Sequence, residues 1–125
     1  MAAQLAEIDD RVSVAAQMQQ DEETGPIVLI NTFTAAPEDA ETLLAVWAED
    51  AAFMKRQPGF IPAQMHRGIA GSTTFVNIAV WDSPQALRAA FFTPEFQAQM
   101  ARYPDSTVTR PHLFQKVGVP GICVA

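Results

Sequence analysis

The polar side chains best placed to do chemistry lie in an otherwise apolar stretch that runs from Phe75 to Trp81. Because the side chains of a β-strand alternate between two faces, Phe75, Asn77 and Trp81 share one face if this stretch is a strand. A buried carboxamide without a hydrogen-bond partner costs about 1–3 kcal/mol. Asn77 is therefore either a structural hydrogen-bonding residue or, together with the indole N–H of Trp81, a polar point in an apolar pocket.

A second asparagine, Asn31, occupies a similar position in the apolar stretch 27–34. If the two stretches are neighbouring strands, both amides can approach one another on one face of a sheet. Apolar side chains at helical spacing would then form the opposite wall of a space suited to a flat aromatic ligand. The candidate wall residues are Trp47, Phe53, Met54, Phe91, Phe96 and Met100, with Phe75 on the strand itself. The alternative is that these side chains fill the core and that the amides bond to neighbouring backbone.

Metal and nucleophile chemistry have little support in the residue pattern. The two histidines, His66 and His112, lie in different predicted strands, and neither has a carboxylate cluster nearby in the sequence. The single cysteine, Cys123, lies in a tail that contains glycine and proline. The chain shows neither a nucleophile elbow nor a phosphate-binding glycine loop. We therefore expect no metal site and no acyl or phosphoryl transfer.

Composition restricts the partners and the compartment. The chain has 125 residues, a hydrophobic fraction of 49% and a formal net charge of −6, which fits one domain with a single core. Basic residues do not cluster, so nucleic-acid binding is not expected. No apolar run reaches the length of a membrane span, and the acidic N-terminal segment does not resemble a signal peptide. Since a single cysteine fits a reducing compartment, we expect a cytoplasmic protein.

The order of predicted elements indicates the fold class. Apolar alternation predicts strands over residues 27–34, 60–67, 73–81 and 108–119, with helices over 37–57 and from residue 84 onward. The order β-α-β-β-α-β is typical of an α+β, ferredoxin-like fold with a four-stranded antiparallel sheet and both helices on one face. The bare face would be apolar, and a symmetric homodimer that pairs the two sheet faces would bury it. Its predicted members are Val28, Ile30, Val76, Ile78 and Val80.

The chain divides into three predicted segments. Residues 1–25 form an acidic extension with a short amphipathic helix over 1–20, which is either mobile or an arm packed on a partner subunit. Residues 26–119 form the main domain. Residues 120–125 form a C-terminal tail.

Several of these residues together resemble the antibiotic biosynthesis monooxygenase family. The shared features are Asn31, the helix that contains Trp47, the turn Gln57–Phe60, and the stretches Asn77–Ser83 and Ala86–Phe96. The resemblance spans about residues 26–118 and implies a homodimer with a dimeric α+β barrel.

Some members of that family form quinones from polycyclic aromatic polyketides, with O2 and without metal, flavin or haem. The resemblance implies that Asn77 and Trp81 line the pocket, that Asn31 contributes, and that Arg102 corresponds to an arginine near the end of the second helical region. A tyrosine that some members carry in the second helix is replaced here by Leu87. The axial histidine of the haem-degrading members has no counterpart between Trp81 and residue 103.

Together with the apolar pocket, the resemblance implies a cofactor-independent monooxygenase that oxidises a phenolic or polycyclic aromatic substrate with O2 to a quinone, with Asn77, Trp81 and Asn31 as catalytic residues. Two alternatives stay open: a dimeric small-ligand-binding protein without turnover, and a haem-degrading monooxygenase. Amides and indoles are not strong bases. A base, if one is needed, would come from His66, His112 or the neighbourhood of Arg102, or the substrate would ionise by itself.

Overall fold

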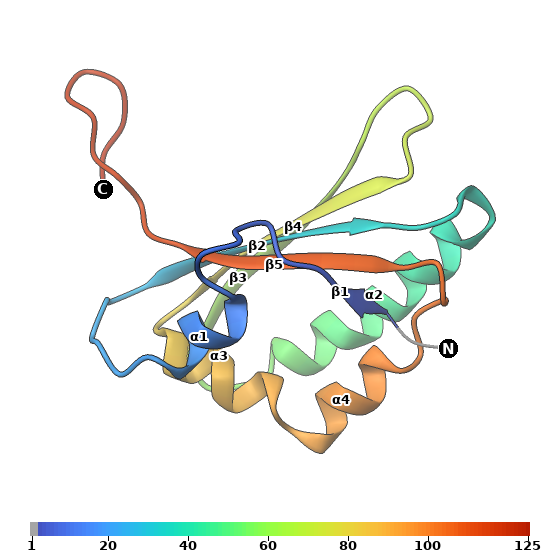
Figure 1. The fold of residues 1–125 in the computed structure, drawn as a ribbon, viewed down its shortest axis with the longest axis horizontal. Coiled ribbons are helices and arrows are strands. Elements are labelled where there is room, and N and C mark those ends of the chain that lie inside the picture. The colour runs from blue at the N-terminus through green and yellow to red at the C-terminus, as the bar shows by residue number, and fades with distance from the viewer. Residues whose placement is uncertain (1–2) are drawn as a thin grey trace.

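The computed structural model describes residues 3–125 and shows four helices on one face of a twisted sheet (Figure 1). The sheet has the strand order β1-β5-β2-β4-β3. Its strands are β1 (Gln4–Leu5), β2 (Ile27–Thr34), β3 (Phe60–Arg67), β4 (Thr74–Trp81) and β5 (Val108–Phe114). The helices are α1 (Val14–Gln19), α2 (Ala40–Met54), α3 (Pro84–Phe91) and α4 (Pro94–Met100), and a 3₁₀ turn η1 (Pro37–Asp39) precedes α2.

The predicted α+β, ferredoxin-like arrangement is confirmed for β2 to β5, whose mutual pairings are all antiparallel. The predicted count of four strands is wrong, because β1 adds a fifth strand that pairs in parallel with β5. The Gln4 amide donates to the Thr107 carbonyl at 2.9 Å and the Ala6 amide donates to the Thr109 carbonyl at 2.8 Å. A two-residue strand has too little alternation for a sequence pattern to detect.

The predicted helix over residues 1–20 is also wrong in extent, and its first two residues lie outside the described part of the chain. The helix is confined to α1, because Asp9 accepts a hydrogen bond from the Arg11 amide and so forms a turn. Ser13 then caps α1 by accepting from the Ala16 amide at 3.1 Å. The segment packs against its own chain, where Val14 and Met18 are each 2% exposed.

The predicted last strand over residues 108–119 ends early, at Phe114. Phe114 pairs with Val28, which lies next to the first residue of β2. Because β2 provides no backbone beyond Ile27, β5 loses its hydrogen-bonding neighbour at this point. Helix α2 likewise ends at Met54, before the predicted end at Gln57.

The two faces of the sheet have different surroundings. Side chains of β4 that point toward the helices are buried, whereas those of the opposite face are half-buried or exposed. Ile78 is 39% exposed and Phe114 is 37% exposed. Figure 1 shows no helix on this second face, in the part of the chain that the structure describes.

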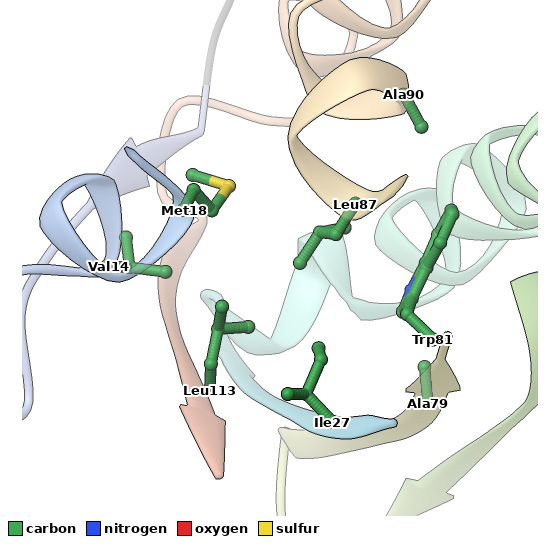
Figure 2. Packing of buried hydrophobic residues seen from close by; sticks show 8 residues of the cluster. All are labelled: Val14, Met18, Ile27, Ala79, Trp81, Leu87, Ala90 and Leu113. Carbon is green, nitrogen blue, oxygen red and sulfur yellow. The ribbon is translucent and has the colours of Figure 1, made fainter. Parts of the chain in front are cut away.

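Helix α1 packs against one of the two core clusters. Figure 2 shows Val14 and Met18 of α1 directed toward Ile27, Leu87 and Leu113, with Trp81 beside Leu87. Within residues 3–125, no helix combines the length and apolar character that crossing a membrane requires.

Candidate active site

A cavity of about 70 Å³ lies between the helix-covered face of the sheet and the helices. Most of its wall is aliphatic or aromatic. The lining residues are Val14, Met18, Leu29, Asn31, Phe33, Trp47, Asp50, Ala51, Met54, Phe60, Ala63, Asn77, Ala79, Trp81, Leu87, Phe91, Phe96 and Pro111. The space is large enough for small molecules or one edge of a planar ring system, and the flexible side chains of Met18 and Met54 border it.

The two asparagines lie directly opposite one another on the floor of this cavity. Asn31 of β2 and Asn77 of β4 are Cα partners in the antiparallel register, which brings their Cβ atoms to about 4.5–5.5 Å. The side-chain Oδ1 atoms of both residues are buried and have no hydrogen-bond partner among the described residues. Since an unpartnered buried acceptor is unfavourable, the pair is suited to receive a polar group of a ligand.

Trp81 lies two residues after Ala79 on the same face of β4 and is 1% exposed. Its ring meets the Phe60 ring edge-on, with centroids 5.4 Å apart and planes at 89°. This edge-to-face contact, of the kind that aromatic pairs favour, holds the indole at the wall of the cavity.

Helix α2 forms much of the opposite wall. Trp47, Asp50, Ala51 and Met54 line the cavity at the i, i+3, i+4 and i+7 spacing of one helix face. Phe53 lies outside this stripe and does not line the cavity, because successive helical residues are rotated by about 100°.

Helices α3 and α4 close the remaining side with two of the expected aromatic residues. The Phe91 and Phe96 rings lie 4.8 Å apart, centroid to centroid, and both line the cavity. Leu87 lines it as well, at the position where the family resemblance implies a tyrosine in some members.

Three other expected substrate-binding residues lie elsewhere. Phe75 is fully buried in a second core cluster, and Met100 packs against that cluster. The Arg67 guanidinium lies over the Phe75 ring, 5.1 Å from its centroid. Arg102 is half-exposed at the surface in an ion pair with Glu49. Phe75 thus lies on the correct face of β4 without reaching the cavity, because the cavity occupies only part of the space under the sheet.

Sequence reasoning missed one ionisable side chain in the cavity wall. Asp50 is 6% exposed, and its Oδ2 accepts a hydrogen bond from the Tyr103 hydroxyl at 3.1 Å. Its Oδ1 is buried without a hydrogen-bond partner in residues 3–125. Burial raises the pKa of Asp50 to about 7, and the Tyr103 hydrogen bond lowers it in part. The available signal was a carboxylate in the apolar stripe of α2, three residues after Trp47.

The two histidines do not reach the cavity. His66 is exposed on β3 and its Nδ1 lies 3.2 Å from the Val76 carbonyl oxygen. His112 is buried, with Nε2 at 3.1 Å from the Gln17 side-chain nitrogen. Among the described residues, no group of three or more His, Cys, Asp or Glu side chains could hold a metal ion, and no histidine lines the cavity. The axial ligand of a haem site therefore has no candidate in this wall.

Replacement of Met18 with alanine is expected to lower the free energy of unfolding by about 2–5 kcal/mol, because Met18 is buried and lines the cavity from α1. Thermal and denaturant unfolding measure this loss. The matched control is Gln19→Ala on the exposed side of the same helix, which is expected to stay within about 0.5 kcal/mol of the parent chain. Equal, small effects of both changes would contradict the packing of α1 on the core.

Most of the chain is similar in sequence to one protein family. The family model described as antibiotic biosynthesis monooxygenase matches residues 26–102. Deoxynogalonate monooxygenase from Streptomyces nogalater is 39% identical over 70 residues, and the alignment covers 56% of this chain and 58% of that relative. The chain thus spans less than two thirds of the length of this curated relative.

Solved structures show the same similarity. SnoaB, a cofactor-independent oxygenase from Streptomyces nogalater, has a TM-score of 0.67 and 30% identity, with 78% of this chain and 99% of that chain covered. PA3566 from Pseudomonas aeruginosa is similar in fold, with a TM-score of 0.61, 22% identity, and coverage of 78% and 100%. The matched region contains β2 to α4, and hence both asparagines, Trp81 and the face of α2 that borders the cavity. The chain therefore belongs to the antibiotic biosynthesis monooxygenase family.

Proposed function

We propose that this protein is a cofactor-independent monooxygenase that oxidises a hydroxylated aromatic substrate with O2 to a quinone in the cavity between sheet and helices. The observation that carries the proposal is the Asn31–Asn77 pair, which faces an aromatic cavity with two Oδ1 atoms that have no hydrogen-bond partner within residues 3–125. Membership of the family supports it, as does the similarity to SnoaB, which is described as a cofactor-independent oxygenase.

In the proposed reaction the substrate hydroxyl loses its proton, and the resulting phenolate passes one electron to O2. The aryloxyl radical and superoxide then combine into a carbon–oxygen bond. After protonation, the hydroperoxide loses water together with the hydrogen on that carbon, which leaves a carbonyl. For 1-naphthol the balance is C10H8O + O2 → C10H6O2 + H2O, so one oxygen atom enters the product and the other leaves as water.

The residues around the cavity would assist the charged steps. The Asn31 and Asn77 side chains can accept a hydrogen bond from the substrate hydroxyl through Oδ1. Their N–H groups can donate hydrogen bonds to the phenolate oxygen. The indole N–H of Trp81 is a further donor. In a cavity lined by Phe91, Phe96 and other apolar side chains, fixed donors stabilise developing negative charge more strongly than they would in water.

A substrate with two or three fused rings would need more room than 70 Å³. Met54 on α2 and Met18 on α1 are unbranched side chains that can change rotamer to admit it. Since α1 lies outside the family-matched residues 26–102, Met18 is a feature by which this chain could select substrates differently from its relatives.

The function is tested by incubation of the protein with 1-naphthol, and with the three-ring phenol 9-anthrol, in air and under nitrogen. Quinone absorbance is expected in air only and in proportion to enzyme. Stoichiometric binding of either phenol without any quinone in air would favour the non-enzymatic ligand-binding alternative. A Soret shift with haemin, followed by loss of haem, would favour haem degradation instead.

We further propose a homodimer in which the uncovered sheet faces pack together. Ile78 on this face is 39% exposed beside half-buried Val76 and Val80, and dimer formation would remove such an apolar surface from water. Ile78→Arg is therefore expected to convert dimers to monomers in sedimentation velocity. Ile69→Arg, in the β3–β4 turn at 89% exposure, is the control that should leave the dimer intact. A parent chain that sediments as a monomer at every concentration would rule the dimer out.

A further inference from the structure

Asp50 is the one ionisable side chain among the residues that line the cavity, counted over residues 3–125. Its carboxylate has two distinct environments. Oδ2 accepts the hydroxyl of Tyr103 at 3.1 Å, whereas Oδ1 is buried with no hydrogen-bond partner in the described chain. A buried carboxylate oxygen without a partner is costly, so a ligand that donates a proton or hydrogen bond to Oδ1 would satisfy it.

The proposed reaction needs a proton acceptor that no other lining residue can supply. The amides of Asn31 and Asn77 and the indole of Trp81 are not basic at neutral pH. His66 lies exposed on β3, and His112 is directed to Gln17. Arg102 forms an ion pair with Glu49 at the surface. The side chains of His66, His112, Glu49 and Arg102 do not line the cavity.

We propose that Asp50 is the catalytic base of this site, and that it takes the substrate hydroxyl proton on Oδ1 while Tyr103 holds Oδ2. This inference rests on the proposed function and adds a residue to it. The phenolic O–H bond breaks, its electron pair stays on the substrate oxygen, and the proton forms an O–H bond on Asp50. The neutral carboxyl group can then return this proton to the peroxide anion, which restores the carboxylate for the next cycle.

The position of Asp50 suits this role. It lines the cavity from the same face of α2 as Trp47 and Met54, and the asparagine pair lines the same cavity from the sheet. A phenol that stacks between the sheet and α2 could therefore direct its hydroxyl toward either polar group. Burial raises the pKa of Asp50 to about 7, close to neutral pH, where a general base works best.

The environment of Asp50 contains one other titratable group that acts on it. The Tyr103 hydroxyl comes from the segment between α4 and β5, and its own pKa is raised by burial and by Asp50, so it remains a donor. Glu49, the neighbour on α2, points to the surface and pairs with Arg102. The cavity residues contributed by β2, β3, β4, β5, α1, α3 and α4 are uncharged.

The test compares Asp50→Asn with the parent chain over pH, with quinone formation from 1-naphthol in air as the readout. Near pH 7.5 the variant is expected to lose about 10²–10⁴-fold in kcat. The deficit should shrink as pH approaches about 10, because phenols then ionise in solution and need no base. A deficit that stays constant over pH, or no deficit at all, would overturn the role of Asp50.

Two further variants separate a base from a structural residue. Glu49→Gln makes the same carboxylate-to-amide change one residue away, at the surface, and is expected to retain parental activity. Tyr103→Phe removes the hydrogen bond that lowers the pKa of Asp50, so the rise of kcat with pH should move to higher pH without the loss seen in Asp50→Asn. An unshifted profile for Tyr103→Phe would contradict the pairing on which the proposal depends.

Failure of the proposed function is distinguishable from failure of this inference. If the parent chain forms no quinone, the monooxygenase proposal falls. Binding of 1-naphthol under nitrogen, followed by tryptophan fluorescence, then tests Asp50 alone. As pH rises through about 7, the affinity for 1-naphthol should increase in the parent chain and stay constant in Asp50→Asn. The reason is that an ionised carboxylate accepts a stronger hydrogen bond from the phenol at Oδ1. Identical curves would overturn the inference.

Discussion

Replacement of Asn77 with alanine is expected to lower kcat/KM for quinone formation by about 10²–10³-fold, which corresponds to about 2.7–4 kcal/mol of transition-state stabilisation. Asn77 is 9% exposed, lies opposite Asn31 on the cavity floor and has no partner for Oδ1 among the described residues. Its Oδ1 is therefore available to accept a hydrogen bond from a substrate. The measurement is steady-state quinone formation from 1-naphthol, with the melting temperature recorded in parallel.

Gln64→Ala provides the matched control for this change. Gln64 carries the same carboxamide on the neighbouring strand β3, exposed and away from the cavity, where its amide donates to the Met65 carbonyl at 3.2 Å. Removal of this group is expected to leave kcat/KM unchanged. An Asn77→Ala enzyme as active as Gln64→Ala would show that the asparagine pair is only structural.

The second large effect concerns stability. In the folded chain the pKa of Asp50 is raised from 3.8 to about 7 by burial, so the folded state binds its proton more tightly than the unfolded state. The associated stability is present below about pH 4 and is lost as pH rises through about 7. Asp50→Asn removes this titration. Its free energy of unfolding, relative to the parent chain, is therefore expected to increase by about 4 kcal/mol between pH 4 and pH 8.

Urea unfolding at a series of pH values measures this difference. Asparagine keeps an acceptor for the Tyr103 hydroxyl, which limits other changes at the site. Glu49→Gln is the control, since the Glu49 carboxylate is half-exposed at the surface. The plot of unfolding free energy against pH for this variant should run parallel to that of the parent chain. A pH-independent difference between Asp50→Asn and the parent chain would mean that Asp50 titrates normally. Higher stability of Asp50→Asn combined with lower activity would indicate a residue that is retained for catalysis at the expense of stability.

The central part of the fold could be predicted from local patterns. Alternation places Asn77 and Trp81 on one face, and the order of elements makes β2 and β4 neighbours, so the meeting of Asn31 and Asn77 follows from topology alone. The stripe on α2 likewise places Trp47 and Met54 toward the sheet. These features depend on the two periodicities of backbone structure, which a sequence displays directly.

The remainder depends on contacts between residues far apart in the chain. The pKa of Asp50 is raised only because packing between distant parts of the chain buries its carboxylate, beside Tyr103, which lies 53 positions later. The role of Met18 depends on where a six-residue helix docks, and α1 has too few residues to reveal its buried face. Phe75 lies on the predicted face, yet Arg67 and the second core cluster surround it, because a strand is longer than the cavity that it borders.

Isotope labelling tests the central claim most directly, namely that O2 reacts with a hydroxylated aromatic in this cavity without a cofactor. Protein freed of metals by chelation, and verified by absorbance to lack flavin and haem, is supplied with 1-naphthol or 9-anthrol under ¹⁸O2, and the products are analysed by mass spectrometry. We expect one ¹⁸O atom in the quinone and one in water, with the rate reduced by Asn77→Ala. Quinone without ¹⁸O, or labelled quinone formed equally fast by Asn77→Ala, would contradict the proposed oxygenase site.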